Sequence, residues 1–179
     1  MSDLTVLHSQ KTPGHEELVL IALRVTPYHD GPQFYTLLAV GGENERPLTA
    51  DGSILFFKRP EQAEAVLKLD TSMSQLGPVP QEVESLCDAA EALYLVNSQD
   101  SDPNGVLLDC LMIFDDLVRA AQINMPERYQ GILTELTARL TEGKQLGAIF
   151  VNSSLRNHVE DALLWCVGAV VVKARVISE

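Results

Sequence analysis

Nearly continuous apolar runs follow one another in the N-terminal part of the chain and predict β-strands. Strong runs occupy 17–26, 34–42 and 53–57, and a weaker one lies at 4–8. The segments between the strong runs are short and contain Pro, Gly and Asp, which favour turns. Short connections favour an antiparallel meander, because parallel strands need long crossovers. We therefore expect residues 1–70 to form a β-rich lobe.

A proline marks the point at which the last of these strands gives way to a helix. Pro60 follows the final apolar run and precedes Glu61. Proline at the first helical position loses no hydrogen bond, and an acidic side chain in the first turn suits the helix dipole. We expect one helix of the N-terminal lobe to begin at Pro60. The same pattern recurs at Pro80, Pro103 and Pro126.

Apolar residues spaced three and four apart predict amphipathic helices through most of the remaining chain. The helix predicted at about 103–122 is apolar over a wide arc, so we expect it to be the central one, with Asp102 as its N-cap. After the last helix, Gly168 precedes the run AVVVKARVI, whose β-branched residues predict a closing strand. The four predicted helices occupy about 80–96, 103–122, 126–142 and 154–167.

Together these elements predict an α+β protein. We expect an N-terminal antiparallel β-meander with one helix, packed against three to four C-terminal helices and completed by the closing strand. Residues 71–80 contain Ser, Gly and Pro and predict a linker between the lobe 1–70 and a mainly helical lobe 81–179. If the closing strand returns to the N-terminal sheet, the two lobes share one core.

The overall composition is that of a soluble globular protein, with 46% hydrophobic and 21% charged residues. The net charge of −12 argues against nucleic acids and anionic membranes as partners, because those ligands require a surplus of Lys and Arg. The longest apolar run, 162–172, is far shorter than the roughly 20 residues of a membrane helix. The first residues show no basic, apolar leader, so we expect a cytoplasmic protein.

Cysteine usage points in the same direction. Cys87, Cys110 and Cys166 are an odd number, widely spaced, and lie in apolar surroundings. No CxxC pair occurs, so the sequence indicates neither a zinc site nor a disulfide framework. We expect buried free thiols in a reducing compartment.

The distribution of charge is the most unusual feature of the chain. From Leu69 through Val118 there is no Lys or Arg, and most of the negative charge of the protein lies in this stretch. Most of its helical acids fall outside the apolar stripes, so we expect them to form one acidic surface. The acids of the stretch are Asp70, Glu82, Glu84, Asp88, Glu91, Asp100, Asp102, Asp109, Asp115 and Asp116.

Our leading hypothesis is a non-enzymatic interaction module, such as an adaptor, regulator or inhibitor-like protein. An acidic helical face would attract a basic protein partner and raise the rate and selectivity of association. The simpler interpretation of the same charges is a solvated face that keeps the protein soluble. The residues predicted to contact the partner are Glu84, Asp88, Glu91, Asp109, Asp115 and Asp116.

The alternative hypothesis is a small-ligand-binding protein or a metal-assisted enzyme with carboxylates in a cleft between sheet and helices. The direction of the acids distinguishes the two hypotheses, because convergence on one cleft favours the second. The sequence assigns no cofactor and no metal, since phosphate-binding, nucleophile-elbow and di-iron motifs do not occur. His158 and Asp161, three residues apart, are typical of an exposed helix pair, although an oriented general base would have the same spacing.

Self-association is a further hypothesis. The predicted strand 53–57 contains the apolar sequence ILFF. If this strand lies at an edge of the sheet, it would pair readily with a second copy and form a homo-oligomer.

Overall fold

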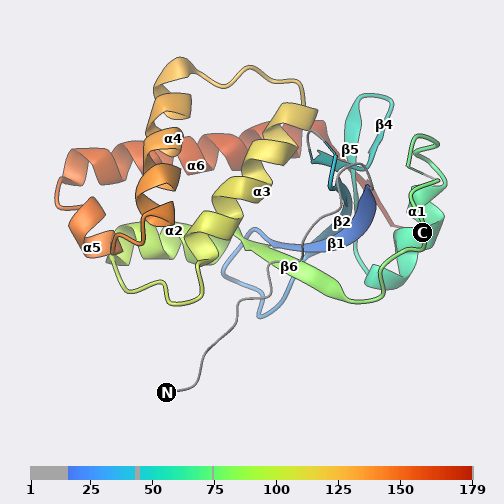
Figure 1. Cartoon of the computed structure of the whole chain (residues 1–179), viewed down its shortest axis with the longest axis horizontal. Helices are drawn as coiled ribbons and strands as arrows, with labels where there is room; N and C mark the ends of the chain where they lie inside the picture. Colours follow the sequence, from blue (N-terminus) through green and yellow to red (C-terminus); the bar gives the residue numbers. More distant parts are fainter. Residues whose placement is uncertain (1–15, 43–44, 74, 179) are drawn as a thin grey trace.

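A computed structural model describes residues 16–42, 45–73 and 75–178 of the chain. It shows a mixed α+β fold, in which one sheet lies between a short helix and a larger group of helices (Figure 1). The predicted fold class is therefore confirmed. The predicted strand at 4–8 lies outside the described residues.

The N-terminal strands form the predicted meander. Strand β1 (Glu17–Arg24) pairs antiparallel with β2 (Phe34–Val40), and β2 pairs antiparallel with β3 (Arg46–Pro47). Strands β4 (Thr49–Ala50) and β5 (Ser53–Phe57) form a hairpin. Its two connecting residues, an Asp-Gly pair, both have positive φ, which matches the twist of a tight hairpin.

The helix after β5 begins at Pro60, as predicted. A 3-10 turn, η1 (Pro60–Gln62), leads directly into the short helix α1 (Ala63–Leu67). The side chain of Gln62 accepts hydrogen bonds from the backbone N–H groups of Lys58 and Arg59, both at 3.1 Å. This contact ties the corner to the start of the helix. Helix α1 then covers one face of the sheet, where its apolar residues pack with those of β1, β2 and β5.

The predicted helix at 80–96 is wrong in its first half. Residues Val83–Asp88 form strand β6, which pairs parallel with β1, and only Ala89–Ser98 form helix α2. Three-and-four spacing across this segment suggested a helix, but Val83 and Leu86 are 43% and 40% exposed. The open edge of β1 offers backbone partners to an extended segment, and tertiary pairing overrides the local pattern.

Three further helices begin close to their predicted positions. They are α3 (Val106–Ala120), α4 (Glu127–Thr141) and α6 (Ser153–Lys173). The short helix α5 (Leu146–Ile149) was not predicted. The N-cap position of α3 is Gly105 and not the predicted Asp102. The carboxylate of Asp102 still accepts hydrogen bonds from two backbone N–H groups of the first turn, both at 2.9 Å.

The closing strand is confirmed, although it begins later than predicted. Helix α6 continues past Gly168 to Lys173, and β7 (Ala174–Ile177) then pairs parallel with β5. Strand β5 thus lies between β7 on one side and β4 and β2 on the other. The hypothesis that 53–57 lies at a sheet edge is wrong, so this strand does not support the predicted self-association. Within the described ranges, β6 and β7 are the edges.

The main core lies between the sheet and the C-terminal helices. It combines residues of β1, β2 and β5 with residues of β6, α2, α3 and α6, so both halves of the chain contribute to it. Helix α3 crosses this layer between β6 and α4 (Figure 1). None of the helices in the described ranges combines the length and the apolar content that a membrane crossing needs.

Candidate binding site along helix α3

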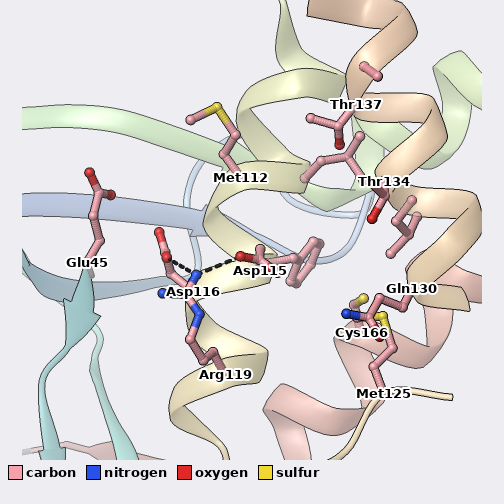
Figure 2. Close-up of a pocket in the computed structure, with 14 residues that line it drawn as sticks. Glu45, Met112, Asp115, Asp116, Arg119, Met125, Gln130, Thr134, Thr137 and Cys166 are labelled. Carbon is pink, nitrogen blue, oxygen red and sulfur yellow. Dashed lines mark hydrogen bonds and ion pairs between the residues drawn. The ribbon is translucent and has the colours of Figure 1, made fainter. Parts of the chain in front are cut away.

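Helix α3 buries one stripe of apolar side chains and carries a mainly polar stripe on its other side. Leu107, Cys110, Phe114 and Leu117 face the core. The opposite stripe, here called the α3 ridge, lies between the sheet and α4 (Figure 2). The α3 ridge consists of Asp109, Met112, Asp115, Asp116 and Arg119.

A groove of about 600 Å³ runs along one side of the α3 ridge, between α3 and α4. Its polar rim includes Gln130, Thr134 and Thr137 of α4, which Figure 2 shows across from the ridge. Met112 is 58% exposed and stands above the groove as a flexible apolar side chain. The apolar lining consists of Leu111, Met112, Phe114, Met125, Leu133 and Cys166.

A smaller hollow of about 160 Å³ lies on the other side of the ridge, between α3 and the sheet. Its floor is apolar and comes from β1 and β2. Its rim carries four carboxylates from three separate segments of the chain. These are Glu45 before β3, Glu84 of β6, and Asp109 and Asp116 of α3.

Arg119 partly neutralises the acids of the ridge. Its Nη2 lies 2.6 Å from Oδ2 of Asp115 and 2.7 Å from Oδ1 of Asp116 (Figure 2). Arg119 follows Asp115 by four residues and Asp116 by three, so the helix itself brings its guanidinium close to both carboxylates. One guanidinium faces two carboxylates, and the ridge keeps a net negative charge.

Burial makes Asp116 unusual among these acids. It is 9% exposed, and loss of solvent, together with the nearby charge of Glu45, raises the pKa of Asp116 to about 6, although Arg119 opposes this shift. Partial burial, followed by the charge of Asp102, also raises the pKa of Asp109. A cation placed in either hollow would favour the ionised form of these groups.

The structure brings together four of the six acids predicted to contact a partner. Glu84 and Asp109 line the sheet-side hollow, Asp115 lines the groove, and Asp116 lines both.

The other two predicted acids, Asp88 and Glu91, line neither hollow. Asp88 is buried at the start of α2, where its carboxylate pairs with Arg24 at 2.8 Å. Its second oxygen accepts a hydrogen bond from the backbone N–H of Glu91 at 2.9 Å. Asp88 therefore stabilises the start of α2 and its contact with β1, and its charge is not available to a partner.

Two charged residues of the site were not among those predicted from the sequence. Arg119 comes immediately after the cation-free stretch, and its spacing from the two preceding aspartates was a usable signal. Glu45 lies in the connection between β2 and β3 and reaches the hollow only because β3 pairs with β2. No local pattern could have placed it there.

The described residues build no metal site, because no suitable group of three or more His, Cys, Asp or Glu side chains occurs in those ranges. Cys87 and Cys110 are buried with their sulfur atoms 3.3 Å apart, and Cys166 forms part of the groove wall. His158 and Asp161 are both exposed on α6 and line none of these hollows.

The two hollows along α3 combine apolar linings with carboxylates at their rims. Apolar linings can take up methylene or methyl groups, and the carboxylates around them can pair with ammonium or guanidinium groups. The protein as a whole carries the same sign of charge, at −12. Comparison with protein-family models, with curated proteins and with solved structures finds no match to this chain, so its function has to be inferred from this geometry.

Proposed function

We propose that the protein is a non-enzymatic interaction module that binds a basic segment of a protein partner along the α3 ridge. The observation that carries this proposal is that Glu84, Asp109, Asp115 and Asp116 do not converge on one cleft. They are distributed over the rims of two adjoining hollows with apolar linings, one on each side of the α3 ridge. A merely solvated acidic face would not need hollows between its charges. A basic amphipathic segment would fill the hollows with apolar groups and pair its cations with the rim.

The side chains of the ridge suit a protein partner. Met112 and Met125 line the groove, and methionine adapts to differently shaped apolar groups. Asp115 has a side chain that is 71% exposed, so it can exchange Arg119 for a cation of the partner at little cost. The charge of the whole stretch 69–118 would attract the partner over a longer distance and raise the association rate at low salt.

The proposal is tested by selecting peptides from a random library on the immobilised protein and measuring their affinities by calorimetry. Selected peptides should be rich in Lys and Arg, and their affinity should fall when salt rises from about 50 mM to about 300 mM. The variant Asp109→Asn/Asp115→Asn should weaken binding by about tenfold, which corresponds to about 1.4 kcal/mol.

A matched control removes the same charge elsewhere. Glu61→Gln/Glu64→Gln changes two exposed acids, one in η1 and one in α1, on the opposite face of the sheet. This variant should change the affinity by less than about twofold. Equal losses in both variants would indicate attraction by net charge alone, and would contradict a site on α3. Selection of neutral or acidic peptides would also contradict it.

We further propose that the protein acts in the cytoplasm, which its three buried free cysteines support, because reducing compartments keep thiols free. Fractionation of cells that express the full chain with a small tag checks this location. Recovery in an extracellular or membrane fraction would contradict it.

A second candidate function is the binding or conversion of a small cationic ligand in the groove. The raised pKa of Asp116, about 6, favours it, since a carboxyl group that titrates near neutral pH can exchange protons with a ligand. Thermal unfolding in the presence of a panel of amines, guanidines and divalent cations tests this candidate. A selective rise in melting temperature that disappears in Asp116→Asn would favour it over the peptide-binding proposal.

A further inference from the structure

Strand β6 forms one edge of the sheet among the described residues. In the part of the chain that the structure describes, β6 pairs with β1 on one side and with no strand on the other. A strand of this length extends over about 20 Å, and alternate N–H and C=O groups point away from its neighbour. Backbone groups of this kind form a template for an added strand.

The two sheet edges differ in charge. The edge strand β7 has four residues, carries Arg175 and follows Lys173, and cations of this kind discourage strand addition. Strand β6 lies within the stretch 69–118, which has no Lys or Arg. Two exposed acids lie at this strand: Glu82 immediately before it and Glu84 within it. The edge of β6 therefore repels acidic strands, including that of a second copy, and attracts basic ones.

The sheet-side hollow continues from this edge toward the α3 ridge. Cys87 of β6 contacts Cys110 of α3, so Ser85, two residues earlier, shares that face of the strand. Ser85 lines the hollow together with Asp109 and Met112. Glu84 lines it too, because the pairing of β6 with β1 shifts register at this residue and interrupts the strict alternation of side chains. A strand added beside β6 would place every second side chain on this same face, next to the acids of the hollow.

We propose that an extended basic segment of the protein partner adds to the sheet as a strand along the free edge of β6, with its cationic side chains paired with Glu84 and Asp109. Backbone hydrogen bonds to β6 supply affinity, and the alternate side chains supply selectivity, as in other cases of strand addition. The inference rests on the proposed function, because it specifies how the same basic partner binds.

The probe is a capped seven-residue peptide of alternating lysine and valine, which combines cations with high strand propensity. Two further versions carry N-methyl groups on the odd or on the even amides. In an added strand, one set of amides faces β6 and the other faces solvent. One methylated version should therefore lose at least about tenfold in affinity, and the other should bind nearly as well as the unmodified peptide.

Amide exchange measured by NMR locates the bound peptide. The outward amides of β6 should exchange about tenfold more slowly in the complex, since they gain hydrogen-bond partners. Glu84→Gln/Asp109→Asn should weaken binding by about tenfold, and the α1 control Glu61→Gln/Glu64→Gln should not. Equal binding of the two methylated versions, or unchanged exchange in β6, would overturn strand addition.

The outcomes separate this inference from the proposed function. If library-selected basic peptides bind and respond to Asp109→Asn/Asp115→Asn, but the alternating peptide shows no dependence on backbone methylation, the site on α3 stands and strand addition is wrong. If neither kind of basic peptide binds, both proposals fail.

Discussion

Asp88 and Arg24 face each other across the parallel pair of β6 and β1, and their side chains form an ion pair of 2.8 Å. The same carboxylate caps helix α2 through the backbone N–H of Glu91. One buried side chain thus joins the edge of the sheet to the start of a helix. This relationship explains why α2 begins at Ala89, and why Asp88 is not part of the exposed acidic surface.

Replacing Asp88 should destabilise the fold. Asp88→Ala removes the helix cap and leaves the guanidinium of Arg24 without its partner, so the free energy of unfolding should fall by about 2–4 kcal/mol. Urea unfolding followed by circular dichroism measures this change. Glu91→Gln is the control, because Glu91 contributes only its backbone N–H to the cap. This variant should lose less than about 0.5 kcal/mol of unfolding free energy. Similar stability of Asp88→Ala and the wild type would show that the cap and the ion pair contribute little.

The titration of Asp116 should be visible in the stability of the protein. Its pKa is about 6 in the folded protein against an ordinary value of 3.8, mainly because of burial and secondarily because of Glu45. Between these two values the folded state holds a proton that the unfolded chain has lost. Stability therefore falls as pH rises through this window, by at most about 3 kcal/mol, and the penalty persists above it.

Asp116→Asn removes this titration. The variant should gain stability relative to the wild type at about pH 7.5 and gain less at about pH 4.5, where only part of the penalty is present, with a difference of about 1–3 kcal/mol between the two conditions. Urea unfolding at both pH values measures it. Asp115→Asn, an exposed neighbour that contacts the same Arg119, serves as control and should show less than about 0.5 kcal/mol of such pH dependence. An equal effect of Asp116→Asn at both pH values would contradict the raised pKa.

Asp70 illustrates a structural acid within the same stretch. It is buried, and its carboxylate accepts hydrogen bonds from the backbone N–H groups of Thr49 and Ser72, both at 3.0 Å, and from the hydroxyl of Ser72 at 2.6 Å. Asp70→Ala should lower the free energy of unfolding by about 2 kcal/mol or more, because two backbone donors lose their partner. Ser72→Ala removes the hydroxyl, which donates to Asp70 and accepts from Arg46, but it leaves both backbone donors paired, so it should cost about 0.5–1.5 kcal/mol. Equal costs for the two variants would contradict this account.

The three cysteines should resist modification in the folded protein. Burial raises the pKa of Cys166 to about 12, and the hydrogen bond with Cys87, followed by burial, raises the pKa of Cys110 well above its ordinary range. Thiolates are the reactive species, so a water-soluble disulfide reagent at about pH 8 should label the native protein at least about a hundredfold more slowly than the urea-unfolded chain. Rapid labelling of Cys166 would show that the groove opens to solvent more widely than the structure indicates.

Much of the fold could be predicted from local patterns. Strands β1, β2 and β5 follow from continuous apolar runs between turn residues, and the helix start at Pro60 follows from proline geometry. Helix α4 follows from three-and-four spacing. These elements have a single arrangement that buries their apolar side chains, so the local pattern decides their conformation.

The segment 83–88 shows where this reasoning stops. Its apolar residues fit a helix and a strand equally well over so short a length, and the pairing partner β1 lies about sixty residues earlier in the chain. Only the assembled sheet offers the hydrogen bonds that make the extended form stable. The candidate site could not be predicted from local patterns either, because Glu45, Glu84 and Asp109 lie in three segments that meet only in the folded protein.

The sequence by itself determined the α+β class, the meander, the closing strand and the concentration of negative charge between residues 69 and 118. Those properties depend on composition and on the spacing of residues along one element, which tertiary contacts do not change. The tertiary structure alone decided the environment of each acid. Asp88 and Asp70 are buried and bind backbone N–H groups. The exposed acids Glu84, Asp109 and Asp115 border open hollows, and Asp115 also pairs with Arg119. The reason is physical, because the environment of a carboxylate depends on burial and on partners from distant segments, and neither is encoded in its immediate neighbours.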